Sequence, residues 1–161
     1  MTSALFRFSI ILLTFWVLPF SSQAQQTSTL EINKADELIG VGAKGFDRLI
    51  GAVEMKHQNS LIYCDSAHFF RAENKARLFG NVRIVDQKDP VQTTSTYAEY
   101  DGNTKMAKLR NHVVFTNQKT TLTTEYLDYD RAGNIAYYYN DGRVVDSVNV
   151  LTSERGTYEV N

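Results

Sequence analysis

The side chains that could carry catalytic or metal chemistry are few and scattered along this chain. Its three histidines stand at different phases of the sequence pattern, and none forms a pair with metal-ligand spacing. Its serines lack the flanking glycines of a nucleophile elbow. The residues in question are His57, His68 and His112, and Ser60, Ser66 and Ser153. We therefore predict that the protein is not an enzyme and needs no cofactor or metal.

Four other features could suggest a site, and each has a plainer structural interpretation. Asp65-Ser66 and the cluster Tyr126 to Asp130 fit exposed strand faces and turns. The single cysteine, Cys64, lies in an alternating segment and is interpreted as a small buried apolar residue. The glycine-rich segment Leu38 to Gly45 lacks the Gly-Lys-Ser/Thr ending of a phosphate loop, so we interpret it as a turn or a bulge.

A recurring strand pattern is the strongest organising signal. The segment Ala76 to Ile84 alternates apolar and polar residues around Gly80-Asn81, and Ala107 to Phe115 repeats it. Looser copies occur at Leu49 to Met55 and at Gly142 to Val145. The copies recur about every 30 residues, which is typical of stacked repeats. Each period holds two strands and two turns.

Short alternating segments follow one another from Leu49 onward, and none shows helical periodicity. Leu30 to Asp36 could be a first strand or an extended arm. Asp101-Gly102-Asn103 is a strong hairpin signal. Further strands are predicted at 61–69, 76–84, 93–100, 107–115, 120–129, 135–139, 143–150 and 156–160.

Strand parity predicts one dry face and one wet face for each strand. The expected dry positions begin with Ala76, Leu78, Gly80, Val82 and Ile84. The other predicted members of this face are Ala107, Leu109, Val113, Phe115, Leu61, Tyr63, Ala67, Phe69, Ala98, Tyr100, Leu122, Leu127 and Tyr129. Such sheets must fold over to cover their dry side. We predict an all-β protein with a folded-over antiparallel sheet, a β-jellyroll or V-shaped solenoid. The inward glycines either let the walls bend or keep the interior partly open as an apolar groove.

The N-terminus predicts export. Residues 1–24 combine Arg7, an apolar run from Phe8 to Phe20 and the small-x-small signal Ser22-Gln23-Ala24. The apolar run is shorter than the roughly 20 residues of a membrane-spanning helix, so a cleaved signal peptide is favoured over an anchor. Residues 25–161 would form one domain. The formal net charge of the whole chain is −1, which gives no sign of nucleic-acid binding.

Several motifs in their order resemble the OstA-like (organic solvent tolerance) family. They are Gly80-Asn81-Val82, Tyr97 to Asn103, Leu122-Thr123-Thr124 with Leu127 to Asp130, and Leu151 to Tyr158. The resemblance covers about residues 30–161. It implies a β-jellyroll with a lengthwise apolar groove and kinship with the periplasmic bridge of lipopolysaccharide transport. Family members of that type hold lipid A acyl chains in the groove and stack head to tail through exposed edge strands.

From this resemblance we expect a periplasmic lipopolysaccharide carrier or bridge. Its expected partners are lipopolysaccharide through lipid A, the inner-membrane and outer-membrane components of the transport machinery, and further copies of itself. The candidate groove residues, chosen by strand parity, are Phe69, Leu78, Val82, Ile84, Tyr100, Leu109, Val113, Phe115 and Tyr129. Two alternatives remain at this point: an assembly module that adds strands to a partner without carrying lipid, and a secreted hydrolase on a β-solenoid.

Overall fold

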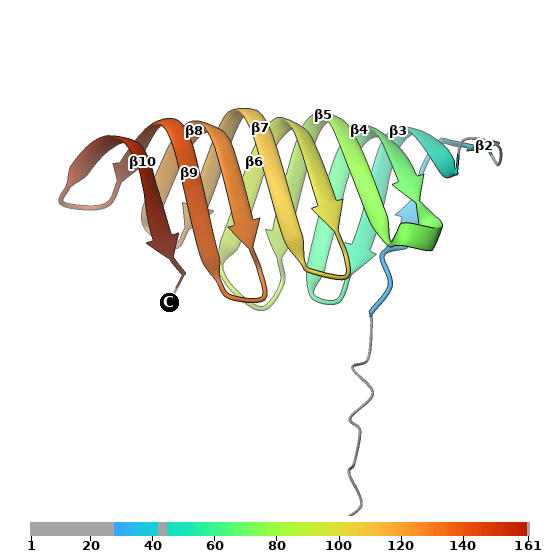
Figure 1. Ribbon diagram of the computed structural model, residues 1–161, viewed down its shortest axis with the longest axis horizontal. Coiled ribbons are helices and arrows are strands. Elements are labelled where there is room, and N and C mark those ends of the chain that lie inside the picture. Colours follow the sequence, from blue (N-terminus) through green and yellow to red (C-terminus); the bar gives the residue numbers. More distant parts are fainter. Residues whose placement is uncertain (1–27, 42–44, 161) are drawn as a thin grey trace, which may run out of the picture.

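The molecule is one long, folded-over antiparallel sheet. The computed structural model describes residues 28–41 and 45–160, and Figure 1 shows the strands side by side along the long axis. The predicted all-β, folded-over architecture is confirmed. The strands are β1 Glu31–Lys34, β2 Glu37–Val41, β3 Phe46–His57, β4 Ser60–Phe70, β5 Lys75–Asp86, β6 Val91–Asp101, β7 Met106–Asn117, β8 Thr120–Asp130, β9 Ile135–Val145 and β10 Val150–Glu159.

The strand order is a simple meander. From β3 to β10 each strand pairs with the next strand in the sequence, while β1 and β2 both pair with β3. No helix within the described residues has the length and apolar character needed to cross a membrane; the short 3-10 segment η2 Arg71–Glu73 lies in a turn. The predicted signal peptide at residues 1–24 lies outside the described residues.

Two segments differ from the sequence expectation. The predicted strands 135–139 and 143–150 are wrong in their bounds, because β9 runs without a break from Ile135 to Val145 and the next turn lies at 146–149. The prediction of a turn or a bulge at Leu38 to Gly45 is wrong for residues 38–41, because Glu37 to Val41 pair with β3 residues 46–50, and residues 42–44 lie outside the described residues. Gly40 is an ordinary strand position there, since an added Cβ would lie 3.8 Å from Asp47 Oδ1, at ordinary contact distance.

The sheet folds over where the strands carry bulges. Each of β3, β5, β7 and β9 has two consecutive residues with positive φ at a break in register, and a bulge of this kind bends its strand. The pairs are Gly51–Ala52, Gly80–Asn81, Asn111–His112 and Asn140–Asp141. Glycine and asparagine tolerate this conformation best. The predicted marker Gly142 directly follows the corner pair Asn140–Asp141 in its strand.

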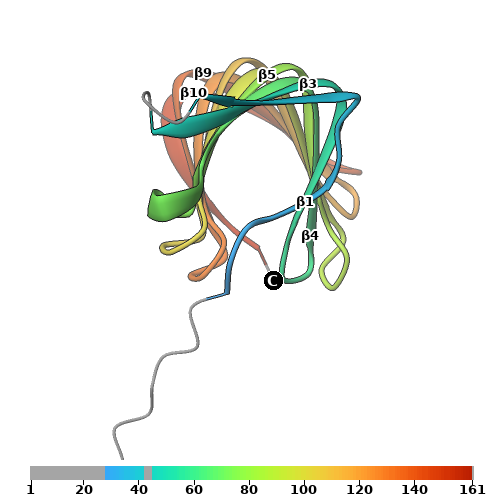
Figure 2. The same ribbon diagram turned by 90° about the vertical axis from the view of Figure 1, so that its right-hand side faces the viewer.

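These corners divide the sheet into two walls, which Figure 2 shows along the long axis. We call first wall the half-strands that end at the turns 57–60, 86–91 and 117–120, and second wall those that end at 70–75, 101–106 and 130–135. Aspartates close several turns by accepting backbone N–H bonds, as Asp101 does from Asn103 and Thr104. The predicted Asp101-Gly102-Asn103 hairpin turn is therefore present.

In every second strand, the residues that face the interior switch between even-numbered and odd-numbered positions at the corner. In β4 the buried residues are Ile62 and Cys64 on the first wall but Ala67 and Phe69 on the second. The expectation that Leu61 and Tyr63 face the interior is therefore wrong. The cause is the unequal count across the corner: three steps of β4, from Tyr63 to Ser66, oppose four steps of β5. A one-residue slip moves a strand's side chains to its other face.

Candidate functional site

The candidate site is the apolar interior between the two walls, which we call the trough. All nine groove residues predicted from parity lie in it. Their side chains are almost completely buried, with exposed fractions between 0% and 4%. They are Phe69, Leu78, Val82, Ile84, Tyr100, Leu109, Val113, Phe115 and Tyr129. They belong to one hydrophobic cluster that runs from Leu30 to Val160.

Aromatic contacts join the two walls within the trough. The ring of Phe115, on the first wall, lies 5.3 Å from the ring of Tyr129 on the second wall, at 79°. It also lies 5.7 Å from the ring of Tyr158 in β10. Edge-to-face pairs of this kind stabilise by about 0.5–1.5 kcal/mol beyond the area that they bury. In this conformation the walls therefore pack directly on each other.

Several trough residues were not among the predicted groove residues. Leu49, Val53, Met55 and Ile62 are 0–1% exposed and extend the cluster toward β1. Leu49, Val53 and Met55 are all odd-numbered, so the alternation within the segment Leu49 to Met55 would have been enough to identify Val53 and Met55. Ile62 required knowledge of the parity change in β4, which the sequence alone does not display.

The glycines of β9 and β10 do not leave empty space in the trough. A Cβ added to Gly142 would lie 2.1 Å from Cε2 of Tyr138, and one at Gly156 would lie 2.3 Å from the Tyr138 hydroxyl. Tyr138 is 5% exposed and bonds Ser153 Oγ at 2.7 Å. These two glycines make room for the Tyr138 ring, whereas Gly51 and Gly80 serve the bends.

A polar seam crosses the open side of the trough, where the turns of the two walls face each other. His57 Nδ1, on the first wall, lies 2.7 Å from the hydroxyl of Tyr100 on the second. Arg131 Nη1 donates to the same hydroxyl at 3.0 Å. The Arg131 guanidinium also pairs with the Asp86 carboxylate of the first wall. Both members of that ion pair are nearly buried, with exposed side-chain fractions of 8% and 9%.

Burial and charge shift the pKa values in this seam. Burial raises the pKa of Tyr100, against the opposing effect of Arg131. Burial also raises the pKa of Asp86, but backbone N–H bonds from Lys88 and Asp89 and the Arg131 guanidinium outweigh it, so the net pKa lies below its usual value. Burial lowers the pKa of His57. The seam therefore holds one ion pair and a neutral imidazole near neutral pH.

The donor pattern assigns the tautomer of His57. The backbone carbonyl of Ser28, 3.1 Å from His57 Nε2, can only accept, so the imidazole proton is on Nε2, which also lies 2.7 Å from the Ser28 hydroxyl. His57 Nδ1 then accepts from the Tyr100 hydroxyl. Farther along the open side, Asn117 Nδ2 donates to the hydroxyl of Tyr158 across the walls at 3.2 Å. Polar side chains thus tie the walls together at both ends of the trough.

The residues considered for chemistry are not gathered at one place. His68 stacks on the outer face, 4.5 Å from the ring of Phe46, while His112 is exposed at a corner. Asp128 pairs with Arg110 at 2.8 Å on the outer face. Among the described residues no group of His, Cys, Asp and Glu could hold a metal ion. Burial raises the pKa of Cys64 to about 12, so its thiol stays protonated and unreactive.

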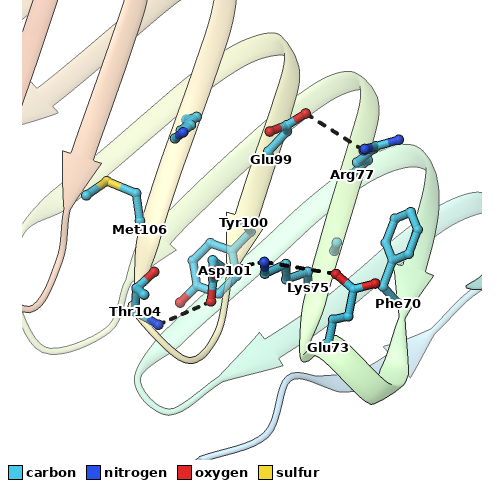
Figure 3. A pocket seen from close by; sticks show the side chains of 11 residues that line it. Phe70, Glu73, Lys75, Arg77, Glu99, Tyr100, Asp101, Thr104 and Met106 are labelled. Atoms are coloured by element: carbon cyan, nitrogen blue, oxygen red, sulfur yellow. Dashed lines mark hydrogen bonds and ion pairs between the residues drawn. The ribbon is translucent and has the colours of Figure 1, made fainter.

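A pocket of about 510 Å³ lies on the outer side of the second wall, between β5, β6 and the turns beside them (Figure 3). Five of its six charged side chains form ion pairs, and Lys108 is the sixth. Lys75 lies 3.5 Å from Asp101 and 4.0 Å from Glu73, and Arg77 lies 3.8 Å from Glu99. Exposed pairs of this kind screen one another, so the pocket lacks the concentrated charge that an anionic ligand requires.

The comparisons with known proteins agree with the motifs. The model of the family described as OstA-like protein matches residues 27–161. The chain belongs to the OstA-like family. A search of curated protein sequences found no match to this OstA-like chain.

Among solved structures, the chain is similar to the crystal structure of LptH from Pseudomonas aeruginosa. That protein is described as the LptA homologous periplasmic component of the conserved lipopolysaccharide transport device. The TM-score is 0.57 at 14% sequence identity, and the alignment covers 63% of this OstA-like chain and 75% of LptH. At this identity the similarity shows a shared fold.

Proposed function

We propose that this OstA-like protein is a non-enzymatic periplasmic carrier or bridge for lipopolysaccharide, and that it binds lipid A acyl chains in the trough. The observation that carries the proposal is the single apolar interior that both walls line, from Phe69 and Leu78 near one end to Phe115 and Tyr129 near the other. The long axis of the trough crosses the strands one after another, so an extended acyl chain can lie along the trough. Membership of the OstA-like family and the fold shared with LptH support the same function.

Lipid entry requires the walls to separate, because the nine candidate residues are at most 4% exposed. Separation exposes apolar surface, and an acyl chain that enters covers it again. Burial of each methylene contributes about 0.8 kcal/mol, so a chain of roughly 12 methylenes contributes on the order of 10 kcal/mol. The exchange of wall-to-wall contacts for wall-to-lipid contacts is therefore energetically accessible.

Photo-crosslinking in cells tests this proposal with adjacent residues as matched probes. Val113 is 1% exposed and faces the trough, whereas Val114 faces outward. Phe115 and Thr116 form a second such pair in β7. A photo-reactive residue at Val113 or Phe115 is expected to crosslink to lipopolysaccharide, and one at Val114 or Thr116 is not. Crosslinks only from outward positions, including Arg83 and His112, would refute the trough as the binding site.

A second candidate function is strand addition to a partner without lipid carriage. It is favoured by the outer edge of β10, which in the described sheet is paired only with β9. The strand begins with Val150 and Leu151, whose exposed fractions are 60% and 58%. An unpaired apolar edge is a template for another chain's strand. Concentration-dependent oligomers that Leu151→Lys abolishes, together with no saturable lipid A binding, would favour this function.

A further inference from the structure

A short segment ahead of β1 crosses the open side of the trough. Residues 28–30 lie between the two walls, since the Ser28 hydroxyl bonds His57 of the first wall and the Leu30 N–H bonds Asn74 of the second. Figure 2 shows the chain at this open side before it enters β1. We call these three residues the strap. The strap is not paired as a strand, since the ladder to β3 begins at Glu31. It is held instead by a small set of side-chain contacts on each wall.

On the second wall the strap is bound by one asparagine. Asn74 Oδ1 accepts the Leu30 backbone N–H at 2.7 Å, and Asn74 Nδ2 donates to the Ser28 carbonyl at 3.0 Å. The amide therefore bonds one edge of the strap at two points, as a residue of a neighbouring strand would. Asn74 itself is fixed in the left-handed conformation, with φ of 57°, at the end of η2. It is also bonded to Asn103 of the next turn at 3.1 Å.

On the first wall the strap joins the polar seam. The Ser28 hydroxyl lies 2.7 Å from His57 Nε2 and accepts a bond from Gln58 Nε2, also at 2.7 Å. His57 continues to the Tyr100 hydroxyl, and Tyr100 to Arg131. Release of Ser28 would therefore remove one partner from a connected network that spans both walls.

Leu30 places an apolar side chain in the end of the trough. It is 4% exposed and belongs to the same cluster as Val53, Met55 and Phe69. The strap thus supplies, from the protein's own chain, the kind of aliphatic group that an acyl chain would supply.

We propose that the end of the trough beside β1 is an acyl-chain subsite, and that the strap occupies it until lipid displaces it. This inference rests on the proposed function, and it adds that the protein's own chain blocks one end of the trough. The strap is suited to displacement because it lies outside the strand ladder, and segments held by few contacts open at lower free energy than the sheet. Release of the strap uncovers apolar surface at the end of the trough and, at the same time, removes a partner of His57 in the seam.

Two variants and one control test the strap through lipid A binding to the purified protein. Asn74→Gly removes both strap bonds, and glycine keeps the left-handed backbone. Asn134→Gly is the matched control, because Asn134 has a φ of 55° in the equivalent turn between β8 and β9. We expect Asn74→Gly to bind lipid A at least about threefold more tightly, since the competent fraction rises, and Asn134→Gly to match the parent protein.

A locked variant provides the opposite perturbation. Ser28→Cys with Gln58→Cys, in a Cys64→Ala background, would be joined by a short bifunctional thiol reagent. We expect the joined protein to bind lipid A more weakly than the parent protein, and the unjoined protein, which has lost the Ser28 hydroxyl bonds to His57 and Gln58, to bind at least as tightly as the parent. Equal binding by joined and unjoined forms, with no gain in Asn74→Gly, would overturn the strap while leaving trough binding intact. Absence of lipid A binding in every form would overturn the proposed function and the strap together.

Discussion

Replacement of Gly80 by alanine should destabilise the fold at one of its corners. Gly80 has a φ of 70°, and an added Cβ would lie 2.3 Å from Asp65 Oδ2 and 3.0 Å from Asp65 Cγ. The left-handed backbone costs an alanine about 1–2 kcal/mol. Relief of the clash would move Asp65 and break its 2.9 Å bond from Asn81 Nδ2, which costs about 0.5–1.5 kcal/mol. We expect a total loss of about 2–3 kcal/mol.

Gly45 is the control for the backbone term alone. Its φ is 69°, nearly that of Gly80, but an added Cβ would meet nothing within 4 Å. Gly45→Ala should therefore lose only about 1–2 kcal/mol. Urea unfolding followed by circular dichroism measures both variants through the midpoint and slope. Equal losses in the two variants would refute the steric contribution at the corner, and a neutral Gly80→Ala would refute both contributions.

Three further predictions concern the core, the seam and the cysteine. Leu109→Ala, at a site with 0% exposure, should lower the unfolding free energy in urea by about 2–5 kcal/mol; Lys108→Ala, on the exposed face, should change it by less than about 0.5 kcal/mol. Burial lowers the pKa of His57, so the unfolded chain binds that proton first and stability should fall as pH drops below about 6.5. His57→Gln should flatten this part of the pH profile measured by urea unfolding, and an unchanged slope would contradict the assignment. Cys64, with its pKa raised to about 12, should resist a thiol reagent in the native protein and react quickly in denaturant.

Much of the architecture could be predicted because the sequence alternates consistently and repeats its turns. The segment Ala76 to Ile84 gave the correct buried face, since Leu78, Val82 and Ile84 share one parity across their corner. The same parity placed Leu109, Val113 and Phe115 correctly. In these strands the two positive-φ residues leave the alternation unchanged beyond the bend.

The parity change in β4 could not be predicted from local alternation. It arises from pairing, because β4 spans the corner with one residue fewer than β5 does. Leu61 and Ile62 are both apolar, so their residue types do not reveal which one faces inward. Gly142 is a related case. Its place in the repeat suggests a bend, whereas in the structure its missing side chain accommodates the Tyr138 ring.

The seam and the strap were also beyond sequence reasoning. His57, Tyr100 and Arg131 come from three different strands or turns, and only the folded sheet brings their polar atoms together. Asp86 follows the pattern of a turn residue, which it also is, and its pairing with Arg131 depends on the approach of the two walls. Long-range polar contacts of this kind leave no periodic signal.

Methyl NMR with lipid A tests the central claim, that acyl chains bind between the walls, most directly. Val113 and Val114 are neighbours in β7 whose methyl groups face the trough and the outer side respectively. Titration of the isotopically labelled protein with lipid A is predicted to shift the methyl signals of Val113, Leu109 and Leu78 saturably and to leave those of Val114 and Val85 in place. Shifts confined to Val114 and Val85, with the interior signals unchanged, would contradict the account.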